Sequence, residues 1–153
     1  MNNKFKAIVL NQSGDKFSRE VKNLDTSFFK SGNVLVKVDY SGLNYKDALI
    51  LRNGAKLVKE YPHIPGIDFS GQVKESDSPD FKPGDDVVVT GSKIGELHPG
   101  GYSQLVKVKS ELLVKKPKSI SNKNAMILGT AGFTSLLCAF AIKAREELLL
   151  GEK

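Results

Sequence analysis

Short stretches of alternating hydrophobic and polar residues run through the first 120 positions of the chain. The clearest covers residues 33–40, where Val34, Val36 and Val38 fall on one face of an extended chain. A two-residue period of this kind predicts a β-strand. Further strands are predicted at 6–10, 68–74, 86–90, 102–108 and 112–115. Because Gly- and Pro-rich turns separate them, the pattern predicts a mainly β domain, a barrel or a sandwich, with flanking helices.

One short helix is predicted inside this β region, over residues 45–51. The stretch contains no Gly or Pro, Asn44 is placed to cap its first turn, and Asn53-Gly54 would end it. The first turn of a helix presents backbone N–H groups, which favour a negatively charged ligand.

The pattern changes to a helical one after Pro117. A helix capped by Ser119 or Ser121 is predicted, with a pause at 129–132 and a second helix over 133–150.

Residues 125–142 carry no charge, and their eighteen positions reach the lower edge of a membrane-spanning length. Two glycines, three hydroxyl residues and a highly charged remainder favour a buried helix of a soluble domain instead. Leu148, Leu149 and Leu150 need a cover near the end of the chain, which a partner or a second copy would provide.

With 153 residues, 40% hydrophobic and 26% charged, the chain fits one soluble core. A net charge of +6 suggests an anionic partner such as nucleic acid, a membrane surface or a phosphorylated ligand. The lysines, however, spread from Lys4 to Lys153 and often alternate with apolar residues, which is typical of solvated strand faces. We therefore expect neither a nucleic-acid nor a membrane partner, and weak attraction to phosphate groups stays as the alternative.

The single cysteine, Cys138, cannot form an internal disulfide, and the apolar run around it predicts a buried, inert thiol in a reducing compartment. The N-terminal segment has too short an apolar stretch for a signal peptide. A cytoplasmic location is expected from both observations.

The sequence contains few residues that could bind a metal ion or act as a catalytic nucleophile. A closed zinc site takes four Cys, His or carboxylate ligands, whereas the sequence has one Cys, two His and no CxxC or HExxH spacing. His63 and His98 each stand beside a proline, which predicts solvent-facing loop positions. The patterns GxSxG and GxxxxGK[ST] do not occur.

The candidate site residues are Asn44, Tyr45, Asp47, Asp68 and Thr130, which lie in the stretches SGLNYKDA, IPGIDFSG and GTAGFT. Asn and Tyr form hydrogen bonds without titrating at neutral pH. Such groups suit hydride transfer, in which the cofactor supplies the chemistry and the protein supplies positioning. A purely structural interpretation is equally open: a helix cap, a first-turn carboxylate and a buried strand-end carboxylate that binds backbone N–H groups.

Five stretches carry a family resemblance: SGLNYKDALILRNG, YPHIPGIDFSGQV, FKPGDDVVVTG, HPGGYSQLVKV and AMILGTAGFTSLLCAFAI. With these, the chain from Lys4 to Ile142 resembles the medium-chain dehydrogenase/reductase superfamily, in its zinc-free quinone oxidoreductase branch and the acryloyl-CoA reductase type.

The resemblance implies a GroES-like catalytic domain, a distorted β-barrel, over residues 1–120. Residues 121–153 would be a helical segment that leads into a nucleotide-binding Rossmann domain, which this sequence lacks. Zinc-dependent relatives carry a Cys at the position of Asn44 and a His-Glu pair at those of Ile67 and Asp68, so no metal is expected.

The resemblance also implies roles for the site residues. Asn44, Tyr45 and Asp47 would be catalytic, Tyr45 and Thr130 would contact NADPH, and Tyr45 is the candidate proton donor. The substrate would be a small molecule, an enoyl thioester or a quinone-like compound. Because the Rossmann domain is missing, we expect weak activity or none from this chain alone. A non-catalytic small-ligand binding module and a homo-oligomer formed through the C-terminal helix are the alternatives.

Overall fold

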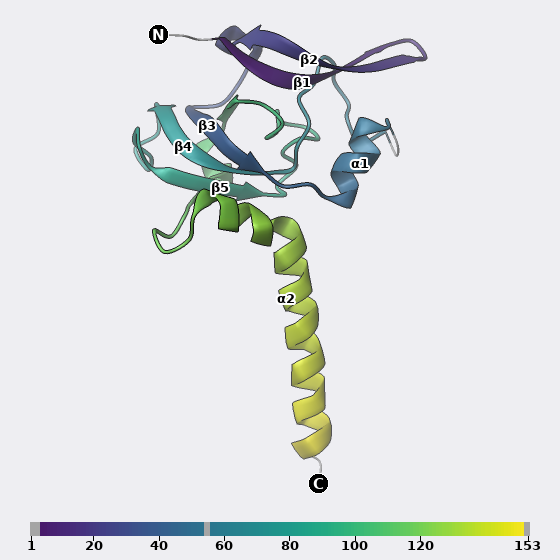
Figure 1. The fold of residues 1–153 in the computed structure, drawn as a ribbon, viewed down its shortest axis with the longest axis vertical. Coiled ribbons are helices and arrows are strands. Elements are labelled where there is room, and N and C mark those ends of the chain that lie inside the picture. The colour runs from purple at the N-terminus through teal and green to yellow at the C-terminus, as the bar shows by residue number, and fades with distance from the viewer. Residues whose placement is uncertain (1–3, 54–55, 152–153) are drawn as a thin grey trace.

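The computed structural model of the chain describes residues 4–53 and 56–151, the last five of them without their side chains. In this part the chain forms two antiparallel sheets and the helices α1 and α2 (Figure 1). One sheet pairs β1 with β2, and the other has the strand order β6-β3-β4-β5-β7. The strands are β1 (Lys4–Ser13), β2 (Lys16–Asp25), β3 (Val34–Ser41), β4 (Asp68–Ser76), β5 (Asp86–Thr90), β6 (Leu105–Val108) and β7 (Val114–Lys115).

The hydrophobic core joins the two sheets into one barrel-like body. Val34, Leu35 and Val36 of β3 are almost fully buried. Phe5 of β1 stacks on Phe29, with the ring centroids 5.2 Å apart. Since burial of one such side chain contributes about 1.5–3 kcal/mol, these contacts hold the β1–β2 hairpin on the larger sheet.

Helix α1 (Tyr45–Leu51) has the predicted bounds and the predicted N-cap, Asn44. The carboxylate of Asp47 accepts the backbone N–H of Asn44 over 2.9 Å, as in a capping box. The sequence predicts that the helix ends at Asn53-Gly54. Asn53 adopts a left-handed φ of 56°, and Gly54 lies outside the described residues.

Three glycines, Gly66, Gly95 and Gly100, pack backbone against backbone where the loops before β4 and β6 meet. A Cβ atom at Gly100 would overlap the carbonyl oxygens of Pro65 and Gly66, and one at Gly95 would lie 2.8 Å from the backbone of Gly66. The φ of Gly66 is 106°, in the region that favours glycine. Tyr102 donates its N–H to Pro65 O over 2.9 Å. This glycine contact fixes the start of β4.

Helix α2 (Asn122–Gly151) is kinked at Gly129, whose φ of 43° and ψ of −156° are not helical. The hydroxyl of Ser121 accepts the N–H of Asn124 over 3.1 Å at the helix start. The helix contacts β3, β4 and β5 through its beginning, and the segment after the kink projects away from the barrel (Figure 1). Of the two predicted caps, Ser121 is confirmed. The pause predicted over 129–132 is confined to Gly129, and the helix resumes at Thr130 instead of Phe133.

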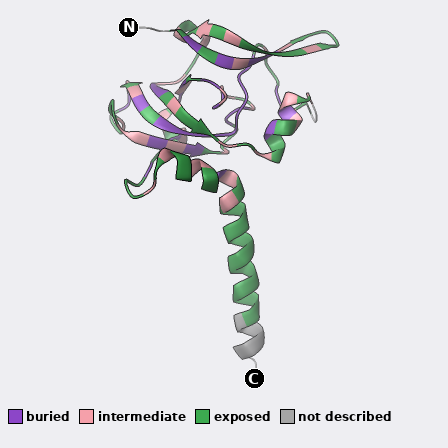
Figure 2. Cartoon of the chain, in the orientation of Figure 1, coloured by how far each residue is buried: buried purple, intermediate pink, exposed green. Residues whose placement is uncertain are grey.

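The projecting segment of α2 is exposed, so two predictions are wrong (Figure 2). Phe133, Phe140 and Ile142 are between 61% and 64% exposed. Cys138 is exposed as well, although the sequence predicts a buried thiol. The reason is that no described element lies beside this segment, and an apolar sequence alone does not say what covers it.

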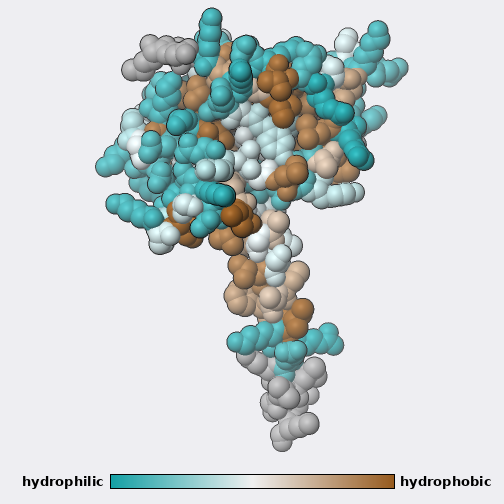
Figure 3. All heavy atoms as spheres, in the orientation of Figure 1, coloured by the Kyte–Doolittle hydropathy of each residue, from teal (hydrophilic) through white to brown (hydrophobic). Residues whose placement is uncertain are grey.

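Within Asn122–Glu146, an apolar stretch of 18 residues has a mean hydropathy of 1.9, and apart from Gly129 its residues are exposed or half-buried. By length and composition this helix is able to cross a membrane, a property that core helices of soluble proteins share. Figure 3 shows its apolar surface beyond the more polar barrel. The prediction about Leu148, Leu149 and Leu150 concerns side chains outside the described part of the chain.

Strand β2 is absent from the sequence-based prediction. Its side chains are mostly exposed, so they show no alternation. The strand forms because its backbone pairs with β1 along the whole length, from Lys4 opposite Asp25 to Ser13 opposite Lys16. Strands β6 and β7 are shorter than predicted.

His63 is buried, which corrects the prediction of a solvent-facing loop, and His98 is partly buried. The reason is local pairing: His63 and Leu10 exchange two backbone hydrogen bonds of 2.8 and 2.9 Å. The side-chain Nε2 atom of His63 is buried and has no hydrogen-bond partner among residues 4–53 and 56–151.

Candidate functional site

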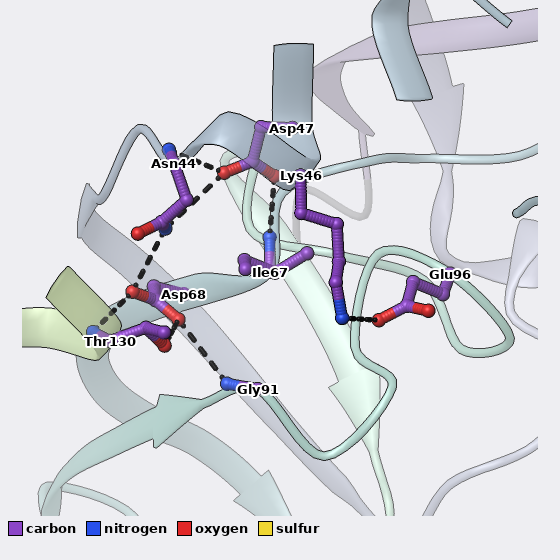
Figure 4. A network of polar contacts seen from close by, with 8 residues as sticks. All are labelled: Asn44, Lys46, Asp47, Ile67, Asp68, Gly91, Glu96 and Thr130. Atoms are coloured by element: carbon purple, nitrogen blue, oxygen red, sulfur yellow. Dashed lines mark hydrogen bonds and ion pairs between the residues drawn. The ribbon is translucent and has the colours of Figure 1, made fainter. Parts of the chain in front are cut away.

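Asp68 lies at the centre of the candidate site, at the first position of β4, and is 1% exposed. Its Oδ2 atom accepts the side-chain amide of Asn44 over 3.1 Å and the backbone N–H of Thr130 over 2.8 Å. Its Oδ1 atom accepts the Thr130 hydroxyl over 2.7 Å and the N–H of Gly91 over 3.2 Å. Both oxygens are therefore occupied by donors from three other segments (Figure 4).

Asp47 is the second buried carboxylate of the site. Its Oδ1 atom accepts the N–H of Ile67 over 2.9 Å, and its Oδ2 atom accepts the side-chain amide of Asn44 over 3.3 Å. Burial raises the pKa of Asp47 above its ordinary value of 3.8, while the hydrogen bonds from Ile67 and Asn44 oppose this shift. The carboxylate thus holds α1 against the start of β4.

Asn44 connects these two carboxylates. Its side-chain nitrogen donates to both Asp47 and Asp68, and its backbone places it at the N-cap of α1. The amide plane is therefore fixed from two sides. The structure thus brings together four of the predicted residues, Asn44, Asp47, Asp68 and Thr130.

Tyr45 does not join this network. Its side chain is 80% exposed and forms no hydrogen bond within the described part of the chain. It follows Asn44 directly in the chain, at the first position of α1.

Tyr102 is a site residue that the sequence does not reveal. Its hydroxyl donates to the carbonyl oxygen of Gly42 over 3.1 Å. Burial and the negative charges of Asp47 and Asp68 raise the pKa of Tyr102, so the phenol is neutral at physiological pH. The double glycine before it in the stretch GGYSQ is the only local signal, and turn glycines of this kind occur throughout the chain.

The described residues contain no group of three or more His, Cys, Asp or Glu side chains that could hold a metal ion. The oxygens of Asp47 and Asp68 accept hydrogen bonds from N–H and O–H groups of the protein. This arrangement of hydrogen-bonded polar groups suits the binding of an uncharged polar ligand.

The described residues form two surface hollows on the barrel, at different distances from the candidate site. A cavity of about 480 Å³ is lined by Phe29, Leu35 and neighbouring residues, none of which belongs to the candidate site. A second, of about 350 Å³, runs along the end of β3 from Val38 to Ser41 and includes Tyr102. Only the second borders the candidate site, through the Tyr102 side chain.

Residues 30–118, more than half of the chain, match the alcohol dehydrogenase GroES-like domain family. The chain belongs to this family. It is 44% identical over 141 residues to the acrylyl-CoA reductase AcuI of Ruegeria pomeroyi. The match covers 91% of this chain and 43% of that relative.

The fold of this GroES-like domain is also similar to those of solved oxidoreductase structures. The YhdH oxidoreductase of Salmonella enterica in complex with NADP matches with a TM-score of 0.85 and 43% identity, over 91% of this chain and 43% of that one. YhfP of Bacillus subtilis with NAD bound matches with a TM-score of 0.85 and 40% identity, over 92% and 43%. This chain therefore spans less than half the length of these relatives.

The comparisons confirm the predicted GroES-like fold and the resemblance to the acryloyl-CoA reductase and quinone oxidoreductase type. No Rossmann domain lies within residues 4–53 and 56–151. The boundary at residue 120 stays a prediction, with α2 starting at Asn122 in this GroES-like chain.

Proposed function

We propose that this chain is the catalytic-domain portion of an NADPH-dependent, zinc-independent oxidoreductase that reduces an enoyl thioester or a quinone-like compound. The observation that carries the proposal is the hydrogen-bonded cluster of Asn44, Asp68 and Thr130, which joins the barrel to α2. It occurs in a chain 44% identical to a protein named acrylyl-CoA reductase. The proposal includes weak activity or none for the isolated chain.

Residues next to this cluster in the sequence suit a nicotinamide. Leu43 and Tyr45 flank Asn44 and Leu128 precedes Gly129, and these three side chains are between 47% and 80% exposed. A flat, uncharged ring with a carboxamide needs such a mixture of apolar walls and a few polar groups. When bound, NADPH supplies a hydride. Asn44, Tyr45 and Thr130 would hold and orient the nicotinamide half of the cofactor.

The two aspartates position other groups and do not transfer protons. Every carboxylate oxygen of Asp47 and Asp68 accepts at least one hydrogen bond from the protein. Reduction of an enoyl thioester places a hydride on the β-carbon and negative charge on the thioester oxygen, followed by a proton on the α-carbon. We assign the donor to the exposed hydroxyl of Tyr45, because that of Tyr102 already donates to Gly42.

An NMR titration of the 153-residue chain with NADPH tests the proposal. We expect weak binding that shifts the amide resonances of Asn44, Tyr45 and Thr130. Tyr45→Ala should weaken it, because Tyr45 directly follows Asn44 and carries an exposed ring. Val114→Ala, which shortens another exposed side chain on β7, is the control and should leave it unchanged. Shifts scattered over the surface, or equal losses in both variants, would count against the proposal, and saturation in the low micromolar range would contradict the expected weak binding.

The exposed apolar surface of α2 favours a second candidate, an assembly unit in which two copies pair through this helix. Ile127, Leu136 and Leu137 are between 50% and 67% exposed and extend the apolar surface of the projecting segment. Pairing would remove this surface from water at about 25 cal/mol per Å². Sedimentation at two concentrations tests it, since a clean monomer at the higher concentration would exclude the pairing.

A further inference from the structure

The Asp68 carboxylate joins segments that are far apart in the chain. Its donors are Asn44 at the start of α1, Gly91 after β5, and Thr130, which lies 62 positions further along in α2. The bonds to Thr130 are the shortest, at 2.7 and 2.8 Å, and they engage one carboxylate oxygen each. Two bonds in this arrangement resist both translation and rotation of the Thr130 backbone relative to β4.

The same place is where α2 changes direction. Gly129 is buried and has a non-helical conformation, and a Cβ atom there would lie 2.9 Å from Asp68 Oδ2. The helical segment that begins at Thr130 therefore starts in direct contact with the carboxylate. A negative charge at the start of a helix is favourable, because the first N–H groups carry the positive end of the helix dipole.

Beyond Thr130 little else fixes the direction of this segment. Residues 133–146 are exposed, so no packing against the barrel orients them. The segment before the kink has its own attachments: Ser70 donates its hydroxyl to Asn122 O over 2.7 Å, and the Asn122 amide donates to Asp39 over 2.7 Å. The bonds between Thr130 and Asp68 thus attach the start of the projecting segment to β4.

We propose that Asp68 is a positioning residue that couples the direction of the projecting segment of α2 to the orientation of the Asn44 side chain. The coupling runs through one atom, Oδ2, which accepts both the Thr130 N–H and the Asn44 amide. A force that turns the projecting segment moves this oxygen and so acts on Asn44. This inference concerns the geometry of the chain and stands independently of the proposed reaction.

Distance measurements between spin labels test the first half of this inference. The native Cys138 is exposed on the projecting segment, and Gln72→Cys provides a second labelling position on the exposed side of β4. Thr130→Val removes the hydroxyl bond to Asp68. We expect the distance distribution to shift and broaden in this variant, because the segment loses one of its two bonds to the carboxylate.

Thr134→Val is the matched control. The Thr134 hydroxyl donates to the carbonyl oxygen of Thr130, within the helix and one turn further on, so its loss should leave the distribution unchanged. Asp68→Asn is a second variant, because an amide cannot accept hydrogen bonds at both ends. If Asp68→Asn does not fold, the distance distribution of Thr130→Val alone tests the proposal. A Thr130→Val distribution equal to that of the parent chain would overturn the proposal.

The resonances of the Asn44 side-chain amide test the coupling itself. We expect them to shift in Thr130→Val and to stay unchanged in Thr134→Val. A purely local role of Thr130 in helix stability would move the spin-label distances without moving these resonances. An unshifted Asn44 side chain in Thr130→Val would therefore refute the coupling even if α2 had changed direction.

Discussion

His63 is a buried base with an unused hydrogen-bonding atom. Its backbone is held by Leu10, and its Nε2 atom has no partner. Burial lowers the pKa of His63 below its ordinary value of 6.5, and the nearby His98 acts in the same direction, while the carbonyl of Gly95 and the charge of Glu60 oppose it. The folded protein therefore holds this imidazole in its neutral form.

Folding stability should fall as the pH decreases below about 6.5, because the unfolded chain takes up a proton on His63 that the folded chain does not. The contribution is fully present above that pH and is lost progressively below it. Thermal unfolding followed from about pH 7.5 to about pH 5.5 measures the decline. His63→Gln should reduce its slope. Equal slopes in the parent and the variant would contradict the assignment.

From the sequence, the polar residues of the candidate site are easier to predict than the residues that surround them. Asn44, Asp47 and Asp68 are recognisable because caps, first-turn carboxylates and strand ends have local signals. Tyr102 is not recognisable, since its role depends on a loop contact with Gly42 across 60 positions. The exposure of Cys138 is likewise set by the direction of a helix.

At the scale of elements, α1 and β2 illustrate the same difference. Helix α1 has the predicted bounds because the signals that define it are local. Its cap, Asn44, directly precedes it, and its buried residue Ile50 lies within its seven residues. Strand β2 is stabilised through backbone pairing with β1, and its exposed side chains carry no periodic signal. Local patterns therefore predict elements that bury one face, and they miss strands that a neighbour stabilises.

The kink in α2 allows a matched pair of glycine substitutions. Gly129→Ala should destabilise the protein by about 1–3 kcal/mol, because its φ of 43° is strained for alanine and the new methyl group would meet Asp68. In Gly132→Ala the new methyl group would lie 3.4 Å from the Leu128 side chain and 3.9 Å from the Ile127 carbonyl oxygen, so this variant should be neutral or stabilised by up to about 1 kcal/mol. Denaturant unfolding measures both, and equal effects would refute this account of the kink.

At the scale of the whole molecule, a compact barrel carries a long apolar helix that it does not cover (Figure 3). The GroES-like barrel follows from turn signals and alternating strands, and it is the best predicted part of the chain. The environment of α2 depends on what lies beside it, which no local pattern encodes. The predicted burial is wrong for this reason.

Self-association through α2 should respond to one substitution. Phe140→Ser removes a large, 64% exposed ring from the projecting segment and should lower the concentration dependence of the sedimentation coefficient. Val21→Ser, which removes an apolar side chain 72% exposed on β2, is the control and should have no effect. If Phe140→Ser sediments as the parent chain does at every concentration, this surface does not mediate association.

The glycine contact of Gly66, Gly95 and Gly100 has a consequence for mutational screens. Any side chain there meets backbone atoms, so most variants at these three positions will fail to accumulate as folded protein. An activity screen of the proposed reaction would rank them beside variants of Tyr45, the proposed proton donor, although these glycines supply no reacting group. Protein abundance measured in the same cells separates the two classes, because a chemically impaired variant persists at normal levels whereas a misfolded one is degraded.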